Sequence, residues 1–205
     1  MAALKDSDRT IDRTVCLTGP ESTGKTALAV TLVERLGGTL VREVARDYLQ
    51  VLEIKPDDSD PYGPDDLLEI VQQQIALETH ARSQGGLVVC DTDVLVMQIW
   101  WQEKFGALPE SLRLALAQRS PRFYLLLSPD LPWVADRQRE NPQDRQRLFE
   151  RYRVELEASS FPYAVVAGEG EQRVECALRA IDQWREPPRP IKALADAPAP
   201  CPFDV

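Results

Sequence analysis

The segment Gly19–Thr26 constrains this chain more than any other stretch of its sequence. It reads Gly-Pro-Glu-Ser-Thr-Gly-Lys-Thr and fits the full G-x-x-x-x-G-K-[ST] pattern of a phosphate-binding loop. The apolar residues Val15–Leu17 precede it and Ala27–Val33 follow it, as at a point where a strand turns into a helix. A chance glycine-rich turn would not combine this spacing, the Lys-Thr pair and this placement. The sequence therefore predicts a polyphosphate site at the end of the first strand.

Each residue type in this loop has a physical role in binding phosphate. Gly19 and Gly24 allow a turn that a Cβ would obstruct, so that backbone N–H groups converge on the phosphates. The helix that follows adds the positive end of its dipole. Lys25 can bridge the β- and γ-phosphates, and the Thr26 hydroxyl can ligate the accompanying Mg²⁺. We therefore expect ATP and Mg²⁺ as ligands, with the nucleotide held by Gly19, Glu21, Ser22, Thr23, Gly24, Lys25, Thr26 and Ala27.

Composition narrows the class of ligand and the compartment. The chain of 205 residues has 24 Lys and Arg against 33 Asp and Glu, a formal net charge of −9, which argues against a nucleic-acid partner and favours a small-molecule substrate. It has no run of about eighteen apolar residues and no apolar signal-peptide core in residues 1–13, so we expect no membrane association and a cytoplasmic protein. The four cysteines lack C-x-x-C spacing and are interpreted as reduced packing residues. Homo-oligomerisation is left open.

Apolar runs of strand type alternate with helical patterns along the chain. This alternation predicts an α/β fold, a three-layer P-loop NTPase fold with a central five-stranded parallel sheet flanked by helices. The predicted strands are residues 14–18, 39–44, 87–90, 123–127 and 163–167. We predict a flexible leader over residues 1–13, one domain over residues 14–186 and a Pro-rich tail over residues 187–205. One flanking helix is expected to begin at Asp65 or Asp66, with an apolar face formed by Leu68, Val71, Ile75 and Leu77.

Parallel sheets of this kind bind ligands at the carboxyl ends of their strands, and acidic residues stand at two of these ends. Asp91 follows the buried-looking strand Leu87–Cys90 and is predicted to reach Mg²⁺ or substrate. The alternative is that Asp91 only caps the next helix. The second acid, Asp93, favours a role in the site because a cap alone would not need it.

Glu43 stands where the second strand opens towards the γ-phosphate. It is a candidate for the base that accepts the proton of an attacking hydroxyl. The alternative is a surface glutamate paired with Arg42 or Arg46, and spacing alone does not separate the two interpretations. Arg46 lies about one helical turn further on the same face, so the same two interpretations apply to it.

An arginine-dense segment over about residues 131–147 is predicted to form a lid. Asn141-Pro142 interrupts it, which favours a hinged flap over the alternative of one solvated helical face. Closure of such a flap would exclude water and suppress hydrolysis of ATP. Its guanidinium groups come from Arg137, Arg139, Arg145 and Arg147.

Two adjacent tryptophans, Trp100 and Trp101, lie on a predicted helix and cannot share one of its faces. One is expected to pack with Val94 and Met97, and the other is a candidate for the pocket. Core packing is the favoured interpretation for both, although an aromatic face would suit a flat, cationic ring.

Four motifs together resemble a known family. They are the loop Gly19–Thr26, the Arg-Glu-x-x-Arg-x-Tyr pattern of Arg42–Tyr48, the triplet Asp91–Asp93, and the Pro-Asp-x-Pro-Trp pattern of Pro129–Trp133. These motifs are similar to those of the ribosylnicotinamide kinase domain of NadR-type proteins, within the P-loop kinase superfamily. The resemblance runs from about residue 14 to residue 184 and is more specific than a bare phosphate-binding loop.

The resemblance implies a reaction and a set of roles. The reaction is ATP-dependent phosphorylation of the 5′-hydroxyl of nicotinamide riboside to nicotinamide mononucleotide, in NAD salvage. The implied catalytic residues are Lys25, Glu43, Asp91, Arg137, Arg139 and Arg145. Glu43 is the preferred base, with Asp91 on the metal or the ribose, and Asp91 as the base is the alternative. Thr26 and Asp91 are the implied metal ligands. The implied substrate-binding residues are Glu43, Arg46, Tyr48, Asp91, Asp93 and Trp100.

The sequence also departs from the family in its domain content. NadR-type proteins commonly join this domain to an adenylyltransferase, whose H-x-G-H signature is excluded here by the single histidine of the chain. A stand-alone P-loop kinase domain over residues 14–186 is therefore expected. Two alternatives are a thymidylate- or deoxynucleoside-type kinase and a regulatory P-loop ATPase whose arginine segment contacts a protein partner.

Overall fold

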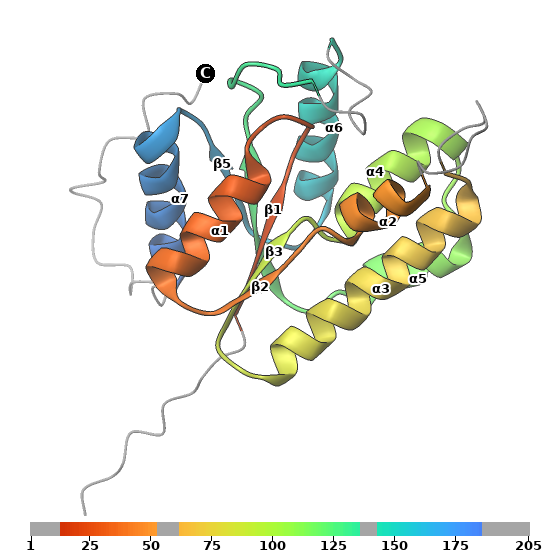
Figure 1. Ribbon diagram of the computed structural model, residues 1–205, viewed down its shortest axis with the longest axis horizontal. Helices are drawn as coiled ribbons and strands as arrows, with labels where there is room; N and C mark the ends of the chain where they lie inside the picture. Colours follow the sequence, from red (N-terminus) through yellow and green to blue (C-terminus); the bar gives the residue numbers. More distant parts are fainter. Residues whose placement is uncertain (1–12, 53–61, 136–142, 186–205) are drawn as a thin grey trace, which may run out of the picture.

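A computed structural model describes residues 13–52, 62–135 and 143–185 of the chain, and Figure 1 shows their arrangement. Several predicted features lie outside the described residues. They are the leader up to residue 12, the tail from residue 187, and the two lid arginines Arg137 and Arg139.

Strands and helices alternate through the described residues, as the sequence predicts. In chain order they are β1 Arg13–Thr18, α1 Lys25–Leu36, β2 Thr39–Val41, α2 Val44–Leu52, α3 Pro64–Ser83, β3 Leu87–Asp91, α4 Val94–Phe105, α5 Glu110–Ala117, β4 Arg122–Leu127, α6 Arg145–Ala158, β5 Tyr163–Val166 and α7 Gly170–Arg185.

The strands form one parallel sheet in the order β2-β3-β1-β4-β5, which confirms the predicted five-stranded parallel sheet. β1 lies in the middle, where Cys16 is in register with Cys90 of β3 and Tyr124 of β4. The chain builds one side of the sheet through β2 and β3 and then crosses to β4 and β5 on the other side. The carboxyl end of β1 therefore lies at the point where strand order reverses, which is where such sheets bind ligands.

Helices cover both faces of the sheet, so the molecule has three layers (Figure 1). α1 and α7 pack on one face against alternate strand residues such as Val15, Leu17 and Leu125. Helices α2 to α6 lie on the other face, over Cys16, Cys90 and other side chains of opposite orientation. Because both faces are covered, the central strands are buried along their whole length, which explains their continuous apolar runs. Cys16 and Cys90 are free and buried, in accord with the predicted packing role.

Two local predictions differ from the structure. β2 ends at Val41 rather than at residue 44, because the chain turns there into α2. α3 begins at Pro64 after the N-cap Gly63, and Asp66 instead accepts a hydrogen bond of 2.9 Å from the Gly63 backbone N–H. No helix within the described ranges is long and apolar enough to span a membrane.

The buried face of α3 is also rotated from the predicted one. Leu77, predicted to be on the apolar face, is 48% exposed. Two polar side chains, Gln74 and Glu78, point inward in its place and are 0% and 6% exposed. Because polar residues occupy part of the buried face of α3, the spacing of its apolar residues does not show which face points to the core.

Gly37 and Gly38 follow the last residue of α1, and substitutions at these two positions show how tightly β2 packs against β3. Both have φ in the left-handed region, 71° and 109°, but a Cβ on Gly38 would lie 2.3 Å from the Leu87 carbonyl oxygen, whereas a Cβ on Gly37 would meet nothing within 4 Å. Gly37→Ala should lower the free energy of unfolding by about 1–3 kcal/mol through backbone strain alone. Gly38→Ala should lower it by more than about 3 kcal/mol because β2 must move away from β3. Urea unfolding measures both, and equal losses would contradict this packing.

Candidate functional site

The loop between β1 and α1 has the backbone conformation that its glycines were predicted to provide. Gly19 has φ 129°, and a Cβ there would lie 2.8 Å from the carbonyl oxygen of Leu127 at the end of β4. Gly24 has φ 80°, and a Cβ there would lie 3.1 Å from Leu131 Cδ1. The loop is therefore pressed against the neighbouring strand and the segment after it. Ser22 also has a positive φ, 58°, so the loop carries backbone strain at a residue other than glycine.

The predicted phosphate-contacting side chains lie at the start of α1. Lys25 Nζ donates to the carbonyl oxygens of Gly19 and Pro20, at 2.9 and 2.7 Å, so its ammonium is held against the loop. Thr23 is buried, and its hydroxyl donates to the Pro20 carbonyl oxygen at 2.9 Å. Thr26 and Ala27 are exposed in the first turn of the helix. The loop thus presents one ammonium, one hydroxyl and a helix N-terminus at the carboxyl edge of the sheet.

Asp91 lies beside this loop because β3 is the neighbour of β1. It is in register with Leu17 and is 3% exposed. Burial raises the pKa of its carboxyl, while a hydrogen bond from the Thr26 hydroxyl and the charges of Lys25 and Arg46 oppose this rise. The predicted pair of Thr26 and Asp91 therefore lies close together at this edge of the sheet.

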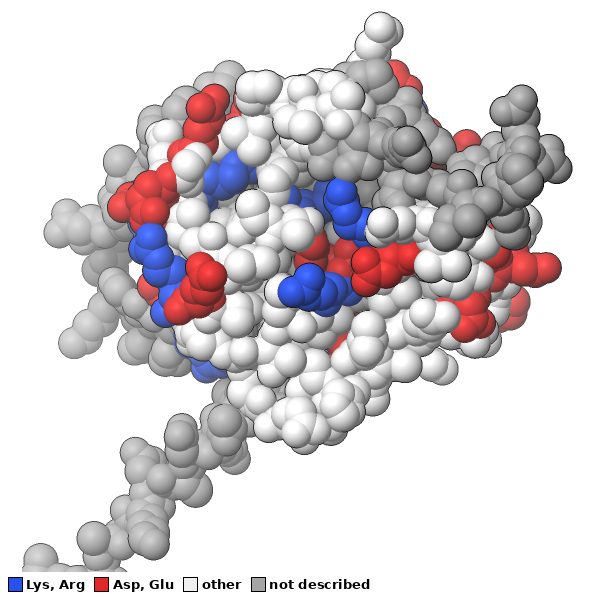
Figure 2. Space-filling view, in the orientation of Figure 1, with Lys and Arg blue, Asp and Glu red and all other residues white. Residues whose placement is uncertain are grey.

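Glu43 reaches the same place from the turn between β2 and α2. It is half-buried, and burial is the main cause that raises its pKa to about 7. Lys25 and Arg46 lower the pKa of Glu43, whereas Asp91 and Glu21 raise it. Because all four of these charged side chains act on the pKa of Glu43, they form one charged cluster with it. Figure 2 shows acidic and basic side chains meeting near the middle of this face of the molecule.

Asp93 has a different role from the one predicted. Its Oδ1 accepts a hydrogen bond of 3.0 Å from the Leu95 backbone N–H, so Asp93 rather than Asp91 caps α4. Its Oδ2 accepts from Arg122 and from Tyr124, and the side chain is 0% exposed. With both oxygens bonded to protein groups, we leave Asp93 out of the substrate-binding residues.

Two further predicted substrate-binding residues, Tyr48 and Trp100, have their described contacts with residues outside the charged cluster. The Tyr48 hydroxyl donates to Asp66 Oδ1 at 3.1 Å, which ties α2 to the start of α3. Trp100 is half-buried, with its ring centroid 6.3 Å from that of Tyr62. Trp101 is buried in the core and donates through its ring N–H to the Ala107 carbonyl oxygen. The two tryptophans therefore point to different surroundings, as their adjacency on one helix requires.

The described lid arginines contact neighbouring protein groups. Arg145 begins α6, donates to the Leu131 carbonyl oxygen at 2.8 Å, and lies 5.7 Å from the centroid of the Trp133 ring. Arg147 pairs with Glu103 of α4 at 2.7 Å and with Asp144 at 3.2 Å. Both side chains thus connect the segment after β4 to the body of the domain.

A buried arginine that the sequence did not single out supports the phosphate-binding loop from behind. Arg173 of α7 is 4% exposed and donates to the carbonyl oxygens of Thr23 and Ser128, at 3.1 and 3.2 Å. It also pairs with Asp130, which belongs to the Pro-Asp-x-Pro-Trp motif. The motif was visible in the sequence, but nothing in the sequence pointed to its partner.

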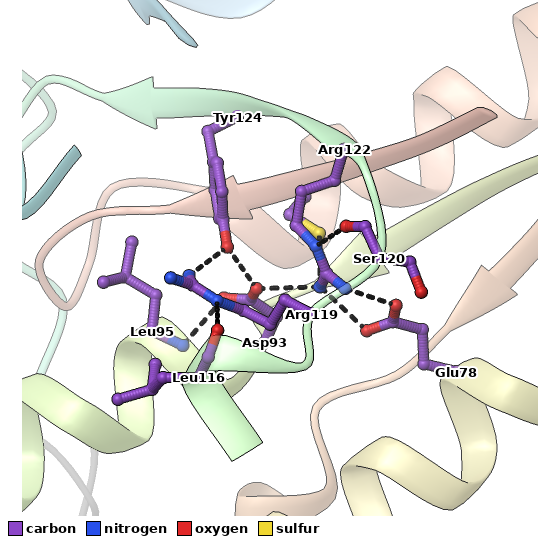
Figure 3. Close-up of polar contacts among 9 residues, drawn as sticks. Glu78, Asp93, Leu95, Leu116, Arg119, Ser120, Arg122 and Tyr124 are labelled. Atoms are coloured by element: carbon purple, nitrogen blue, oxygen red, sulfur yellow. Dashed lines mark hydrogen bonds and ion pairs between the residues drawn. The ribbon is translucent and has the colours of Figure 1, made fainter. Parts of the chain in front are cut away.

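A second buried arginine lies at the start of β4 (Figure 3). Arg122, 3% exposed, donates to Glu78 of α3 at 2.8 and 3.0 Å and to Asp93 at 3.0 Å. The Tyr124 hydroxyl donates to the same Asp93 oxygen at 2.5 Å, and Arg119 donates to the Tyr124 hydroxyl at 2.6 Å. The network links α3, β4 and the turn between β3 and α4. Sequence reasoning missed it because its members are far apart along the chain.

The site fits a magnesium ion that takes most of its ligands from phosphate and water. In the part of the chain that the structure describes, no three His, Cys, Asp or Glu side chains form a metal-binding group. Such a site needs only one or two protein oxygens beside the nucleotide. Asp91 Oδ1 is buried without a hydrogen-bond partner among the described residues, and the Thr26 hydroxyl lies next to the same carboxylate. These two side chains have the chemistry that the ion prefers.

Comparison with known proteins identifies the family. A family model described as an AAA domain matches residues 14–173. The chain belongs to this AAA-domain family. No curated protein sequence matches the chain.

Solved structures share the fold of this family member at low sequence identity. A NadR protein in complex with NR superposes with a TM-score of 0.68 at 20% identity, over 90% of this chain and 54% of that chain. Thymidylate kinase from Ehrlichia chaffeensis gives 0.55 at 12% identity, over 84% and 98%. Deoxyadenosine kinase from M. mycoides gives 0.56 at 11% identity, over 83% and 99%. The chain spans about half the length of the NadR chain. The predicted P-loop kinase fold and its likeness to NadR are confirmed at the level of fold.

The raised pKa of Glu43 predicts how stability changes with pH. The folded protein holds this proton up to about pH 7, whereas the unfolded chain releases it near pH 4.5, so burying the charge costs stability increasingly as pH rises between these values. Glu43→Gln should leave the free energy of unfolding nearly unchanged at pH 4.5 and raise it by about 2–3 kcal/mol at pH 8. Urea unfolding of the ligand-free protein at both pH values measures this.

Glu34→Gln is the matched control, because Glu34 is exposed on α1. The same pH-dependent gain in both variants, or none in Glu43→Gln, would show that burial at Glu43 is not the cause.

Proposed function

We propose that this chain is an ATP-dependent kinase of a small nucleoside-type substrate, and that the substrate is nicotinamide riboside. The observation that carries the proposal is the position of Glu43. Its carboxyl is half-buried, has a pKa raised to about 7, and lies in the same charged cluster as Lys25 and Asp91 at the carboxyl edge of the sheet. Phosphate binding alone would not require a second acid with a raised pKa beside the loop.

The loop and the start of α1 would bind the triphosphate of ATP. Backbone N–H groups of residues 21–24 and the helix N-terminus favour an anion, and the Lys25 ammonium would exchange its carbonyl partners Gly19 and Pro20 for phosphate oxygens. Thr26 and Asp91 would hold Mg²⁺, which neutralises phosphate charge when it is bound. The two acids of the cluster would therefore have different roles, with Asp91 as a metal ligand.

Glu43 would act as the general base. A carboxyl with a pKa of about 7 is largely ionised above neutral pH, yet basic enough to take the proton of a substrate hydroxyl as its oxygen attacks the γ-phosphorus. The new O–P bond forms, the bond to ADP breaks, and the proton stays on Glu43. Arg46, on the next turn of α2, adds positive charge beside this carboxyl. Arg145 and the rest of the segment over residues 131–147 are proposed as the lid.

The choice of substrate has two supports. One is the set of four motifs similar to those of NadR-type proteins, and the other is the fold shared with a NadR protein bound to NR. Trp100 is half-buried and forms an aromatic pair with the buried Tyr62, whose ring centroid already lies 3.7 Å from the Lys104 ammonium. We propose Trp100 as the aromatic side chain that contacts the nicotinamide ring of the substrate, because an aromatic face suits a positively charged ring. The second candidate is a deoxynucleoside or thymidylate, since kinases of both share the fold.

A panel of acceptors tests the proposal. Nicotinamide riboside, thymidine, thymidylate and deoxyadenosine are each incubated with ATP and Mg²⁺, and the products are identified by mass. We expect nicotinamide mononucleotide as the main product. Glu43→Gln should lower kcat by about 10²- to 10⁴-fold because it removes the base, while its Kd for ATP stays within about 3-fold.

Lys25→Ala serves as the inactive control in the same panel. A different phosphorylated acceptor would support the second candidate substrate. Slow release of ADP with every acceptor would instead point to a regulatory ATPase and overturn the kinase proposal.

A further inference from the structure

We propose that the buried network around Arg122 acts as a positioning device for Asp91. The network lies behind the turn that joins β3 to α4, and Figure 3 shows its side chains converging on Asp93. Asp91 and Asp93 are separated by one residue, Thr92, so a constraint on Asp93 is passed to Asp91 through two peptide units. Arg122 and Tyr124 are positioning residues in this proposal, because the hydrogen-bond partners of their side chains among the described residues lie outside residues 19–26. The proposal rests on the proposed role of Asp91 in holding Mg²⁺ with a nucleotide.

Thr92 shows why this turn needs an external constraint. Its φ is 74°, in the left-handed region, where a β-branched residue is a genuine outlier. Its hydroxyl is buried without a hydrogen-bond partner among the described residues, so the side chain of Thr92 does not hold its own backbone in this conformation. Outliers of this kind persist only where the surroundings over-determine them, and they cluster at functional sites.

Asp93 supplies that constraint from both of its carboxylate oxygens. Oδ1 accepts the Leu95 backbone N–H at 3.0 Å and so fixes the start of α4. Oδ2 accepts Arg122 Nη1 at 3.0 Å and the Tyr124 hydroxyl at 2.5 Å, both from β4. Asp93 is therefore hydrogen-bonded both to the start of α4 and to β4, which is separated from β3 by β1 in the sheet.

The charges of the network are balanced, which lets it stay buried and rigid. Arg122 lies between the carboxylates of Glu78 and Asp93, and Arg119 donates to the Tyr124 hydroxyl that also serves Asp93. The two guanidinium groups offset the two carboxylates. Glu78 in turn belongs to α3, so three elements hold Arg122 in one orientation. Such fully bonded networks favour one arrangement of the groups they connect.

On the other side of Thr92, the Asp91 carboxylate lies near Thr26 and has one buried oxygen without a hydrogen-bond partner in the described part of the chain. If Thr92 relaxed to an ordinary φ, this carboxylate would turn away from Thr26. The network therefore sets where a metal ion can bind, although it lies on the far side of the turn. Groups that orient a metal ligand in this way change metal affinity by about 10- to 100-fold when they are removed.

The test removes one hydrogen bond from Asp93 and then relieves the strain separately. Tyr124→Phe keeps the ring and loses the hydroxyl, and Tyr163→Phe is the matched control on β5, where the hydroxyl donates to Glu157 instead. Calorimetry measures ATP binding as a function of Mg²⁺ concentration. Tyr124→Phe should raise the Mg²⁺ concentration for half-maximal binding by about 10-fold, and Tyr163→Phe should not change it. Arg122→Lys should give a shift at least as large, because lysine cannot reach both carboxylates.

Thr92→Gly distinguishes positioning from a general loss of stability. Glycine adopts a positive φ without strain, so the turn then depends less on its anchor. In the Thr92→Gly background, the effect of Tyr124→Phe should fall below about 3-fold. An equal shift in both backgrounds, or no shift in either, would overturn the proposal.

Crystal structures supply a readout that does not depend on nucleotide binding. In Tyr124→Phe the Asp91 carboxylate should move away from the Thr26 hydroxyl, whereas an unmoved carboxylate would overturn the positioning role. Absence of ATP binding by the wild-type chain would instead count against the proposed function, and the positioning role would then be decided by these structures alone.

Discussion

The site depends on two carboxylates being kept next to one ammonium at the edge of the sheet. Parallel strand order makes this possible, because β3 places Asp91 beside the loop that follows β1, and the turn after β2 adds Glu43. Burial raises the pKa of both acids, and the charge of Lys25 works against this rise. The two acids therefore have different surroundings: Asp91 lies near Thr26 and has one buried oxygen without a partner among the described residues, and Glu43 has a pKa near neutral. That difference suits the proposed roles of Asp91 as a metal ligand and of Glu43 as a base.

Buried polar side chains hold each of the segments that meet at this edge. Gln74 of α3 accepts the Val44 backbone N–H at 3.0 Å and so fixes the start of α2 next to Glu43. Arg173 holds the carbonyl oxygen of Thr23, and Asp93 holds the start of α4. A buried polar group left without its partner costs about 1–3 kcal/mol, so the loss of any of these contacts would be destabilising. The core of this domain is apolar between the layers. Its buried polar side chains lie where they hold the loops at the carboxyl edge of the sheet.

The sequence was sufficient for the fold and for the residues that meet at the phosphate loop. Alternating strand and helix patterns predicted the parallel sheet, and the loop spacing predicted how Lys25 and Thr26 begin α1. Pairing was harder to predict, because partners such as Glu78 and Arg122 lie 44 residues apart and carry no motif. The inward face of α3 was misplaced for the same reason, since its polar residues serve contacts that only the assembled domain reveals. Asp93 was misassigned because a capping acid and a substrate-binding acid look alike in a sequence.

In the proposed active site, a bound triphosphate points its terminal phosphate at Lys25, and Glu43 faces that phosphate across the space for the acceptor. A crystal structure of the chain with Mg²⁺ and a non-hydrolysable ATP analogue tests this most directly. We expect phosphates on residues 19–24, Lys25 Nζ within hydrogen-bond distance of the terminal phosphate, and the Glu43 carboxylate on the open side of that phosphate. A triphosphate bound elsewhere, or a Glu43 side chain turned away from the terminal phosphate, would contradict it.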